Sequence, residues 1–338
     1  MINVAVVGYG YWGANLVRNF VENRNCKVVS ICEIDEKKWP ALGRKYPQIF
    51  LTKFYNDLLD NPEINAIVIA TPVSTHYELS RQALEKKKDI FVEKPLTTKS
   101  FQVQELISVA NENKCILFVD HTFEYSPAVI KIKEIIDSGE LGEILYISTS
   151  RINLGLHQSD ISVICDLAPH DLSIIFFWLN EEPIEISAVG KGFIRKSIPD
   201  ISFIKMRFVS GIVANLLLSW LSPIKLRRTV VVGSKKMIVY DDTEMMEKIK
   251  IYDKGVIVNE PNNLNLTKSR LTYKTGGITI PVIETSEPLS IAVNHFIECV
   301  KTRKTPKTDG RNALRIANAL ELAEKSLHTG VGGIFKKC

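Results

Sequence analysis

Three glycines near the start place the strongest constraint on this chain. The sequence begins MINVAVVGYGYWGANLVRNF, so Gly8, Gly10 and Gly13 follow an apolar run and open an amphipathic one. Between a strand and a helix, the first glycine permits a tight turn, the second lets a diphosphate approach the backbone, and the third lets helix and strand pack closely. The unpaired N–H groups at the start of the helix attract the anion. A purely structural glycine turn is the alternative interpretation.

An acidic residue further along tests that interpretation. Glu33 closes the apolar run KVVSICE, 20 positions after Gly13, which is the spacing of a ribose-binding carboxylate. Such a carboxylate repels a 2′-phosphate, so NAD is favoured over NADP as the cofactor. We expect Asp35 to cap the next helix rather than to contact ribose. Lys37 and Lys38 are interpreted as a solvated face of that helix.

The first third of the chain alternates between two patterns. Apolar runs without polar alternation are separated by amphipathic helical runs, which predicts a parallel sheet covered on both faces, the doubly wound α/β class. The predicted strands are 3–7, 27–32, 66–70, 90–92 and 116–119, and the predicted helices are 13–23, 35–46, 75–87 and 100–113.

After residue 119 the pattern changes. A predicted helix over 126–138 ends at Gly139, and alternating runs then predict a meander of mainly antiparallel strands with one buried face. The remaining predictions are a helix at 167–178, loops over the Asn-, Lys-, Thr- and Gly-rich segment 253–280, and helices at 289–302 and 310–329. We expect a nucleotide-binding domain over 1–122 and a substrate domain over 123–338, whose closing helices can pack back on the first domain.

Composition excludes several classes of protein. Hydrophobic residues make up 45% and charged residues 24%, which is typical of a folded globular chain. The net charge of +5 is spread along the chain, which suits an anionic small molecule and not a nucleic acid. The six cysteines form no C-x-x-C pair and lie at no metal-ligand spacing, so we expect reduced thiols, a cytoplasmic location and no metal. No apolar run is long enough to span a membrane, and no signal peptide is evident.

Polar residues follow two of the predicted parallel strands, where ligands bind in this fold class. Thr71 and Pro72 follow strand 66–70, and the sequence Glu93-Lys94-Pro95 follows strand 90–92. A lysine held beside a nicotinamide can polarise a carbonyl or donate a proton, and a solvated surface charge is the alternative. His76 is interpreted as a residue at the start of a helix.

A third motif lies in the second half of the chain, in VICDLAPHDLSII. Asp166 and His170 are four positions apart, so on a helix they share one face. A carboxylate beside an imidazole suits general base catalysis, since histidine titrates near neutral pH. A surface pair and half of a metal site are the alternatives, and no further ligands support the second.

The order of these motifs resembles that of the Gfo/Idh/MocA oxidoreductase family. The similarity covers nearly the whole chain and continues into the closing segments EPLSIAVNHFIECV and TDGRNALRIANALELAEKS. It implies an N-terminal Rossmann domain and a C-terminal α+β domain with an open, mostly antiparallel sheet. In the family that sheet builds the substrate pocket and often the oligomer contact, so we expect a homodimer or homotetramer. The implied reaction is hydride transfer between a nicotinamide and a secondary alcohol of a sugar or cyclitol.

The resemblance places Lys94, Asp166 and His170 at catalytic positions. His170 is expected to take the hydroxyl proton, Lys94 to bind the same oxygen, and Asp166 to orient the substrate, with either His170 or Lys94 as the base. The expected cofactor-binding residues are Gly8, Tyr9, Gly10, Tyr11, Trp12, Gly13, Glu33, Thr71, Pro72, His76, Glu93 and Lys94.

Three stretches narrow the substrate. DHTFEYSPAV, SRINLG and DLAPHD are similar to a subgroup associated with nucleotide-sugar biosynthesis, which acts at C3 of UDP- or dTDP-linked sugars. SVIC stands where common family members carry a glycine pair, which sets this chain apart from inositol and glucose dehydrogenases. The alternatives are an NAD-assisted glycosidase of the same fold and a non-catalytic NAD-binding sensor. The expected substrate residues are Lys94, Tyr125, Arg151, Asn153, Asp166, His170, Lys225 and Arg227.

Overall fold

The computed structural model describes residues 1–158, 161–259 and 270–335. Contacts within the chain divide it into two compact units. Unit 1 comprises Met1–Ser126 and Ser286–Glu321, and unit 2 comprises Pro127–Thr285 and Leu322–Lys337. Unit 1 is therefore discontinuous in sequence, since its last part follows the whole strand-rich region of unit 2.

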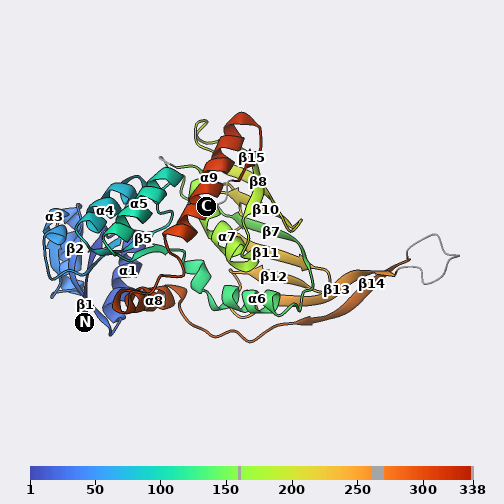
Figure 1. The fold of residues 1–338 in the computed structure, drawn as a ribbon, viewed down its shortest axis with the longest axis horizontal. Coiled ribbons are helices and arrows are strands. Elements are labelled where there is room, and N and C mark those ends of the chain that lie inside the picture. The colour runs from blue at the N-terminus through green and yellow to red at the C-terminus, as the bar shows by residue number, and fades with distance from the viewer. Residues whose placement is uncertain (159–160, 260–269, 336–338) are drawn as a thin grey trace. The chain divides into compact units, whose positions relative to one another are not determined.

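Unit 1 is built on a six-stranded sheet in which every pairing is parallel (Figure 1). Its strand order, β3-β2-β1-β4-β5-β6, confirms the predicted doubly wound class. The short β3 was not predicted, because three residues give too little pattern to read. The strands are β1 (Ile2–Val7), β2 (Cys26–Cys32), β3 (Phe50–Thr52), β4 (Ala66–Ile69), β5 (Asp89–Glu93) and β6 (Leu117–Asp120).

Helices cover both faces of this sheet, as the uninterrupted apolar strands predict. Val4 and Val6 of β1 pack in a core with Phe20 and Phe296, whereas Ala5 and the other alternate residues join a second core on the opposite face. The helices of unit 1 are α1 (Tyr11–Glu22), η1 (Glu36–Lys38), α2 (Trp39–Lys45), α3 (Asn56–Leu59), α4 (Val73–Glu85), α5 (Ser100–Glu112), η2 (Thr122–Tyr125) and α8 (Pro288–Thr302).

Unit 2 contains a nine-stranded sheet with the order β14-β13-β12-β11-β7-β10-β9-β8-β15. Only β10 and β7 pair in parallel among the described pairings, which confirms the predicted open and mostly antiparallel sheet. Its strands are β7 (Ile144–Ile152), β8 (Pro183–Lys191), β9 (Ile201–Phe208), β10 (Val213–Ser219), β11 (Leu226–Gly233), β12 (Met237–Asp241), β13 (Ile249–Asn259), β14 (Arg270–Thr279) and β15 (Gly333–Ile334).

The two faces of this second sheet differ. One face packs against α7 (Val163–Leu179), which in turn packs on α6 (Pro127–Asp137), and it also contacts the end of α9 (Gly310–Thr329), where Ser326 Oγ accepts a hydrogen bond from Ala188 N at 2.9 Å. The other face is exposed: Phe203 is 53% accessible while its neighbour Ile204 is buried. This alternation along β9 is the one-sided burial expected of an antiparallel sheet.

The prediction of loops over 253–280 was wrong for most of that segment. Residues up to 259 and from 270 form β13 and β14, which pair antiparallel and extend as a long ribbon (Figure 1). Val256 lies opposite Tyr273, and Ile257 lies opposite Thr272. These β-branched and aromatic residues stabilise the pairing across the strands, while the polar composition matches the exposure of the ribbon. Residues 260–269 lie outside the described part of the chain.

The structure also bears on two predictions drawn from composition. In the described parts of the chain, no helix combines the length and the apolar character that a membrane span requires. The cysteines at positions 26, 32, 115, 165 and 299 are free thiols. Burial raises the pKa of the Cys26, Cys32, Cys115 and Cys299 thiols to about 11, so they stay protonated near neutral pH.

Candidate functional site

The glycine loop connects β1 to α1, and its three glycines have different surroundings. Gly8 adopts φ +88°, a conformation that side chains rarely take, and a Cβ there would lie 2.6 Å from Ala70 O. A Cβ on Gly13 would collide with Gly8 O, whereas at Gly10 nothing lies within 4 Å. Gly8 thus fits a tight turn, Gly13 fits a close contact between helix and strand, and Gly10 leaves the backbone open to a ligand. Because Gly10 is the N-cap of α1, no side chain competes with an anion for the first N–H groups.

The loop lies where the strand order reverses. β1 pairs with β2 on one side and with β4 on the other, so the residues after β1 and β4 border the crevice that binds ligands in such sheets. Thr71 follows β4, and its hydroxyl lies 2.7 Å from that of Thr75. Tyr11 and Trp12, at the start of α1, are exposed beside the open Gly10. These residues fit a dinucleotide, which would supply a hydride acceptor or donor when bound.

Glu33 is buried at the end of the second strand and accepts several hydrogen bonds. Its Oε2 accepts from Tyr9 N at 2.8 Å and from Lys38 Nζ at 2.9 Å, and its Oε1 accepts from Asp35 N at 2.9 Å. Burial disfavours the charge, but these hydrogen bonds outweigh it and hold the Glu33 pKa below its ordinary value. The expectation for Lys38 was wrong, since its ammonium pairs with Glu33. The cap at Asp35 is confirmed by its hydrogen bond from Lys37 N.

His76 ties two of the motifs together instead of facing a ligand. Its ring is buried, with Nδ1 2.9 Å from Pro95 O and Nε2 2.8 Å from Thr71 O. Burial, opposed by these hydrogen bonds and aided by the nearby Lys94 charge, lowers the pKa of His76, so the ring is neutral near pH 7. A neutral, buried imidazole of this kind holds the two strand ends at a fixed separation.

Lys94 follows β5 and is joined to Pro95 by a cis peptide bond. Its charge shifts the pKa values of His76, Glu93, Asp120 and His121, so the ammonium lies within a cluster of titratable groups at the carboxyl ends of the strands. Asp120 and His121 open the stretch DHTFEYSPAV, but neither was expected at the site from the sequence. Both follow an apolar run, and only the pairing of β6 with β5 brings them beside Lys94.

Asp166 and His170 both lie on α7, in unit 2. The helix begins four residues earlier than predicted, because Ser162 Oγ caps it by accepting hydrogen bonds from Ile164 N and Cys165 N. Asp166 therefore lies in the first helical turn, and its Oδ2 accepts from Trp220 Nε1 at 3.0 Å. Trp220 fixes this carboxylate and was not found from the sequence, since 54 positions separate the pair.

Arg151 has a different role from the one expected. It is buried against α7 and donates two hydrogen bonds of 2.9 Å to the Asp171 carboxylate. Because the guanidinium is enclosed in this ion pair, it anchors α7 to β7 and is not an exposed donor for a substrate. The sequence pattern missed this partner, although Asp171 directly follows His170.

The other expected substrate residues of unit 2 lie at one edge of its sheet. β7 and β10 run in parallel and end at Ile152 and Ser219, so Asn153 and Trp220 follow neighbouring strand ends. β11 begins beside them, with Arg227 opposite Arg151. Lys225 is exposed in the preceding turn, and Arg227 Nη1 lies 3.3 Å from Asp242 Oδ2.

Tyr125 was expected to contact substrate, but the structure buries it in unit 1. Its hydroxyl lies 2.9 Å from His295 Nδ1 and 3.2 Å from Thr308 Oγ1, and its ring stacks on Phe118. Both partners of the Tyr125 hydroxyl lie in the C-terminal part of unit 1, about 180 residues away in sequence. The side chain therefore joins that part to the Rossmann sheet.

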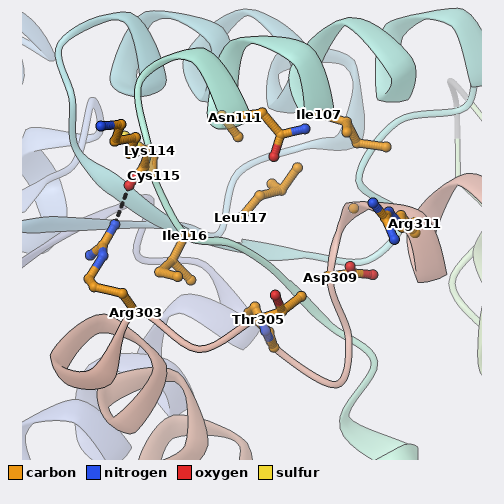
Figure 2. Close-up of a pocket in the computed structure, with 13 residues that line it drawn as sticks. Ile107, Asn111, Lys114, Cys115, Ile116, Leu117, Arg303, Thr305, Asp309 and Arg311 are labelled. Carbon is orange, nitrogen blue, oxygen red and sulfur yellow. Dashed lines mark hydrogen bonds between the residues drawn. The ribbon is translucent and has the colours of Figure 1, made fainter.

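A cavity of about 470 Å³ lies elsewhere in unit 1 (Figure 2). Cys115, Ile116 and Leu117 line it at the beginning of β6, which is the opposite end of the strand from Asp120. Arg303 enters the lining and donates to the backbone carbonyl of Lys114 (Figure 2). None of the expected site residues lines this cavity. Over the described residues, no group of three His, Cys, Asp or Glu side chains is placed to hold a metal ion.

Comparison with curated proteins shows relatives at low to moderate identity. The uncharacterized oxidoreductase YrbE of Bacillus subtilis (strain 168) is 24% identical over 98% of this chain and 95% of that protein. A UDP-N-acetylglucosamine 3-dehydrogenase of Acidithiobacillus ferrooxidans is 30% identical over 155 residues, which is 46% of this chain and 48% of that protein. The second match therefore spans less than half of either protein.

Solved structures share the fold. UDP-N-acetylglucosamine 3-dehydrogenase GnnA from Acidithiobacillus ferrooxidans superimposes with a TM-score of 0.80 at 20% identity, covering 96% of this chain and 97% of that one. GenD2 from gentamicin A biosynthesis, solved in complex with NAD, gives a TM-score of 0.83 at 17% identity, covering 99% and 97%.

Two family models match the chain in succession. Residues 2–121 match the oxidoreductase family with an NAD-binding Rossmann fold, and residues 129–239 match the GFO/IDH/MocA C-terminal domain. The two matches take in most of unit 1 and the strand-rich part of unit 2, in the family's order. With the glycine loop of unit 1 and the mostly antiparallel sheet of unit 2, the chain belongs to the Gfo/Idh/MocA family of oxidoreductases.

Proposed function

We propose that this protein is an NAD-dependent dehydrogenase or ketoreductase that transfers a hydride to or from a secondary alcohol or ketone carbon of a sugar. The observation that carries the proposal is the position of Lys94. It follows β5 at the carboxyl edge of the Rossmann sheet, on the same edge as the glycine loop. His76 links its neighbour Pro95 to the strand end at Thr71, so the lysine backbone is held firmly.

The proposed chemistry divides between three side chains. His170 removes the proton from the sugar hydroxyl while Lys94 hydrogen-bonds to the same oxygen and stabilises its developing negative charge. Asp166, fixed by Trp220, orients a substrate hydroxyl. In the reducing direction the same groups return the proton. Two observations support this division of roles. The chain belongs to a family of oxidoreductases, and Asp166 and His170 lie one helical turn apart on α7, so they share one face of the helix.

We further propose that the substrate is a nucleotide-linked sugar that reacts at C3. A relative named for the oxidation of UDP-N-acetylglucosamine at that position supports this choice. Lys225 and Arg227 lie at the sheet edge where Asn153 and Trp220 follow their strands, and cationic donors there suit a diphosphate. The buried thiols support a reducing, cytoplasmic location.

The test is a direct assay of the purified protein. UDP-N-acetylglucosamine and a panel of UDP- and dTDP-sugars are mixed with NAD, and the 3-keto sugars with NADH, while the NADH absorbance is followed. We expect one sugar to change the absorbance, and Lys94→Ala or His170→Ala to lower the rate by roughly 10²–10⁴-fold. Lys99→Ala, a nearby lysine outside the site, is the matched control. Bound NAD without net change for any sugar would favour a glycosidase cycle or a sensor.

The choice of NAD is a separate proposal that rests on Glu33. Its carboxylate has about four acceptor positions, and three donors are present, so a ribose hydroxyl can still bind while a 2′-phosphate is repelled. Glu33→Ala should lower the preference for NAD over NADP, measured as the ratio of kcat/KM for the two cofactors. An unchanged ratio would place the selective group elsewhere.

We also propose that the exposed face of the unit 2 sheet joins copies of the chain. Val189, Phe203 and Leu217 lie opposite one another on β8, β9 and β10, and they form an apolar row on that face. Val189 is 74% exposed and Phe203 53%. A row of large apolar side chains on the exposed face of a sheet is typical of an interface.

A further inference from the structure

Two buried carboxyl groups beside Lys94 have no part in the proposed chemistry. Glu93 ends β5 and Asp120 ends β6, and the two strands pair in parallel with these residues directly opposite each other. Residues paired in this way project from the same face of a sheet. Glu93 is 8% and Asp120 1% accessible, so the two carboxyl groups meet out of contact with bulk water.

Each carboxyl group has one oxygen with a donor and one without. Glu93 Oε2 accepts from Lys94 N at 3.2 Å, and Asp120 Oδ1 accepts from Thr122 Oγ1 at 2.7 Å. Glu93 Oε1 and Asp120 Oδ2 have no donor among the described residues. The pairing of β5 with β6 sets the two side chains next to each other, but two ionised carboxylates have only acceptors. One shared proton satisfies both remaining oxygens.

The surrounding charges agree with this assignment. Burial raises the pKa of Glu93 well above its ordinary value and that of Asp120 to about 6, opposed in both cases by the Lys94 charge. Burial also lowers the pKa of His121 to about 3, so that ring is neutral. Adjacent buried carboxyls commonly retain one proton between them, because both cannot ionise at low cost. The other titratable groups acting on the cluster are His76, through Lys94, and Tyr125, through Asp120.

We infer that Glu93 and Asp120 are a positioning pair for Lys94: they share one proton, present a single negative charge to the ammonium, and hold the Lys94 N–H through Glu93 Oε2. The role assigned to Lys94 rests on the proposed function, whereas the shared proton does not. Glu93 would thus hold the backbone of Lys94 through a hydrogen bond, and the negative charge of the pair would hold its ammonium group. Asp120, which opens the stretch DHTFEYSPAV but was not expected at the site, becomes a determinant of how the lysine acts.

Infrared difference spectroscopy of the protein without cofactor tests the shared proton. At pH 7 we expect the spectrum of the wild type minus that of Glu93→Gln to show the carbonyl stretch of a buried protonated carboxyl, because the amide of the variant donates to Asp120. The subtraction cancels any band from Glu124, whose pKa burial raises to about 7. Glu112→Gln, at an exposed position on α5, is the control and should leave this region of the spectrum unchanged. If the wild type and Glu93→Gln show the same bands, the pair does not share a proton.

Turnover tests the positioning role. Glu93→Gln and Asp120→Asn each leave one carboxyl and one amide, and so one negative charge, whereas the double variant leaves none. We expect a loss of about two-fold in kcat for each single variant and a loss of roughly 10²-fold for the double variant, far more than the product of the two single losses. The loss in the double variant should fall on kcat and leave the affinity for NAD unchanged, since only the negative charge beside the ammonium has been removed.

The outcomes separate the possible failures. A loss in the double variant that equals the product of the two single losses would mean that the two residues act independently and only on structure. The substitutions are isosteric, so each variant is expected to fold. The melting temperature and the NAD affinity of each variant check this. If the wild type oxidises no sugar, the proposed function fails while the infrared result still decides the shared proton.

Discussion

Gly10 and Gly13 are three positions apart, yet a side chain would meet different surroundings at each. A Cβ at Gly13 would collide with Gly8 O, whereas the space at Gly10 is open. An open position in a loop this tight is the one a ligand is expected to fill.

Gly10→Val should therefore abolish NAD binding and leave the fold intact. A Cβ at this position meets no protein atom within 4 Å, so the valine should be accepted by the fold and occupy the path of the diphosphate. Binding is measured by titration calorimetry and folding by circular dichroism. Gly43→Val, at another open glycine on α2, is the matched control and should bind NAD normally. Full affinity in Gly10→Val would mean that the loop is a structural turn.

His121 should make the stability of the protein depend on pH. Burial lowers its pKa to about 3 in the folded state, while the unfolded chain takes up a proton near pH 6.5. The unfolded state thus binds more protons below that pH, so His121 costs stability as the pH falls from 6.5, by about 1.4 kcal/mol per pH unit at most.

His121→Gln removes this contribution. Thermal unfolding at pH 5 and pH 7.5 should show a smaller loss of stability on acidification for the variant than for the wild type. Equal losses would show that the ring is charged, or solvated, in the folded protein.

Single residues also show what a sequence can and cannot reveal. Glu33 and the three glycines could be proposed for the cofactor site because their predicted roles depend on neighbours within one strand–turn–helix segment. Arg151 and Tyr125 were misread, because their partners, Asp171 and His295, are known only once the chain has folded. The expected site residues themselves remain proposals, since Lys94 lies in unit 1 and Asp166 and His170 lie in unit 2.

At the level of elements, the ion pair between Arg151 and Asp171 fixes α7 to the sheet. Arg151→Ala should destabilise the protein by about 3–5 kcal/mol, because it leaves the Asp171 charge buried without a partner. The free energy of unfolding in urea measures the loss. Arg207→Ala breaks an exposed pair with Glu185 and should cost less than about 1 kcal/mol.

A second variant separates charge from packing. Arg151→Met combined with Asp171→Leu removes both charges and keeps most of the volume, so it should be far less destabilised than Arg151→Ala. An equal loss in the two variants would mean that packing, not the unpaired charge, causes the effect.

Elements were predictable where one periodicity extended over several turns or strands. Five of the six parallel strands of unit 1 are mostly apolar and were placed within a few residues, whereas the three-residue β3 was missed. The start of β13, where Ile249 and Ile251 are buried, fell within the predicted alternating runs. The rest of the ribbon was missed because residues 256–257 and 271–279 are exposed, so they lack the apolar alternation that marks a half-buried strand. Its strands depend on pairing with each other, which composition does not report.

For the whole molecule, the apolar row on the unit 2 sheet predicts self-association. Phe203→Glu places a charge in the middle of the row and should shift the protein toward monomer in sedimentation velocity experiments. Val209→Glu changes a residue that is 67% exposed just after β9 and outside the row, so it should leave the distribution unchanged. A monomeric wild type, or an unaltered Phe203→Glu oligomer, would contradict the proposed interface.

The discontinuity of unit 1 has a consequence for synthesis on the ribosome. Phe296, Val293 and Leu289 of α8 are part of the core that β1 and α1 begin. When the first 126 residues emerge, the apolar surface on which α8 packs is therefore exposed. About 160 further residues must be translated before that helix can form. Unit 2 is nearly complete by then. The core of unit 1, whose strands are translated first, is thus completed only late in synthesis. Until α8 packs on it, its apolar surface is a natural target for a chaperone.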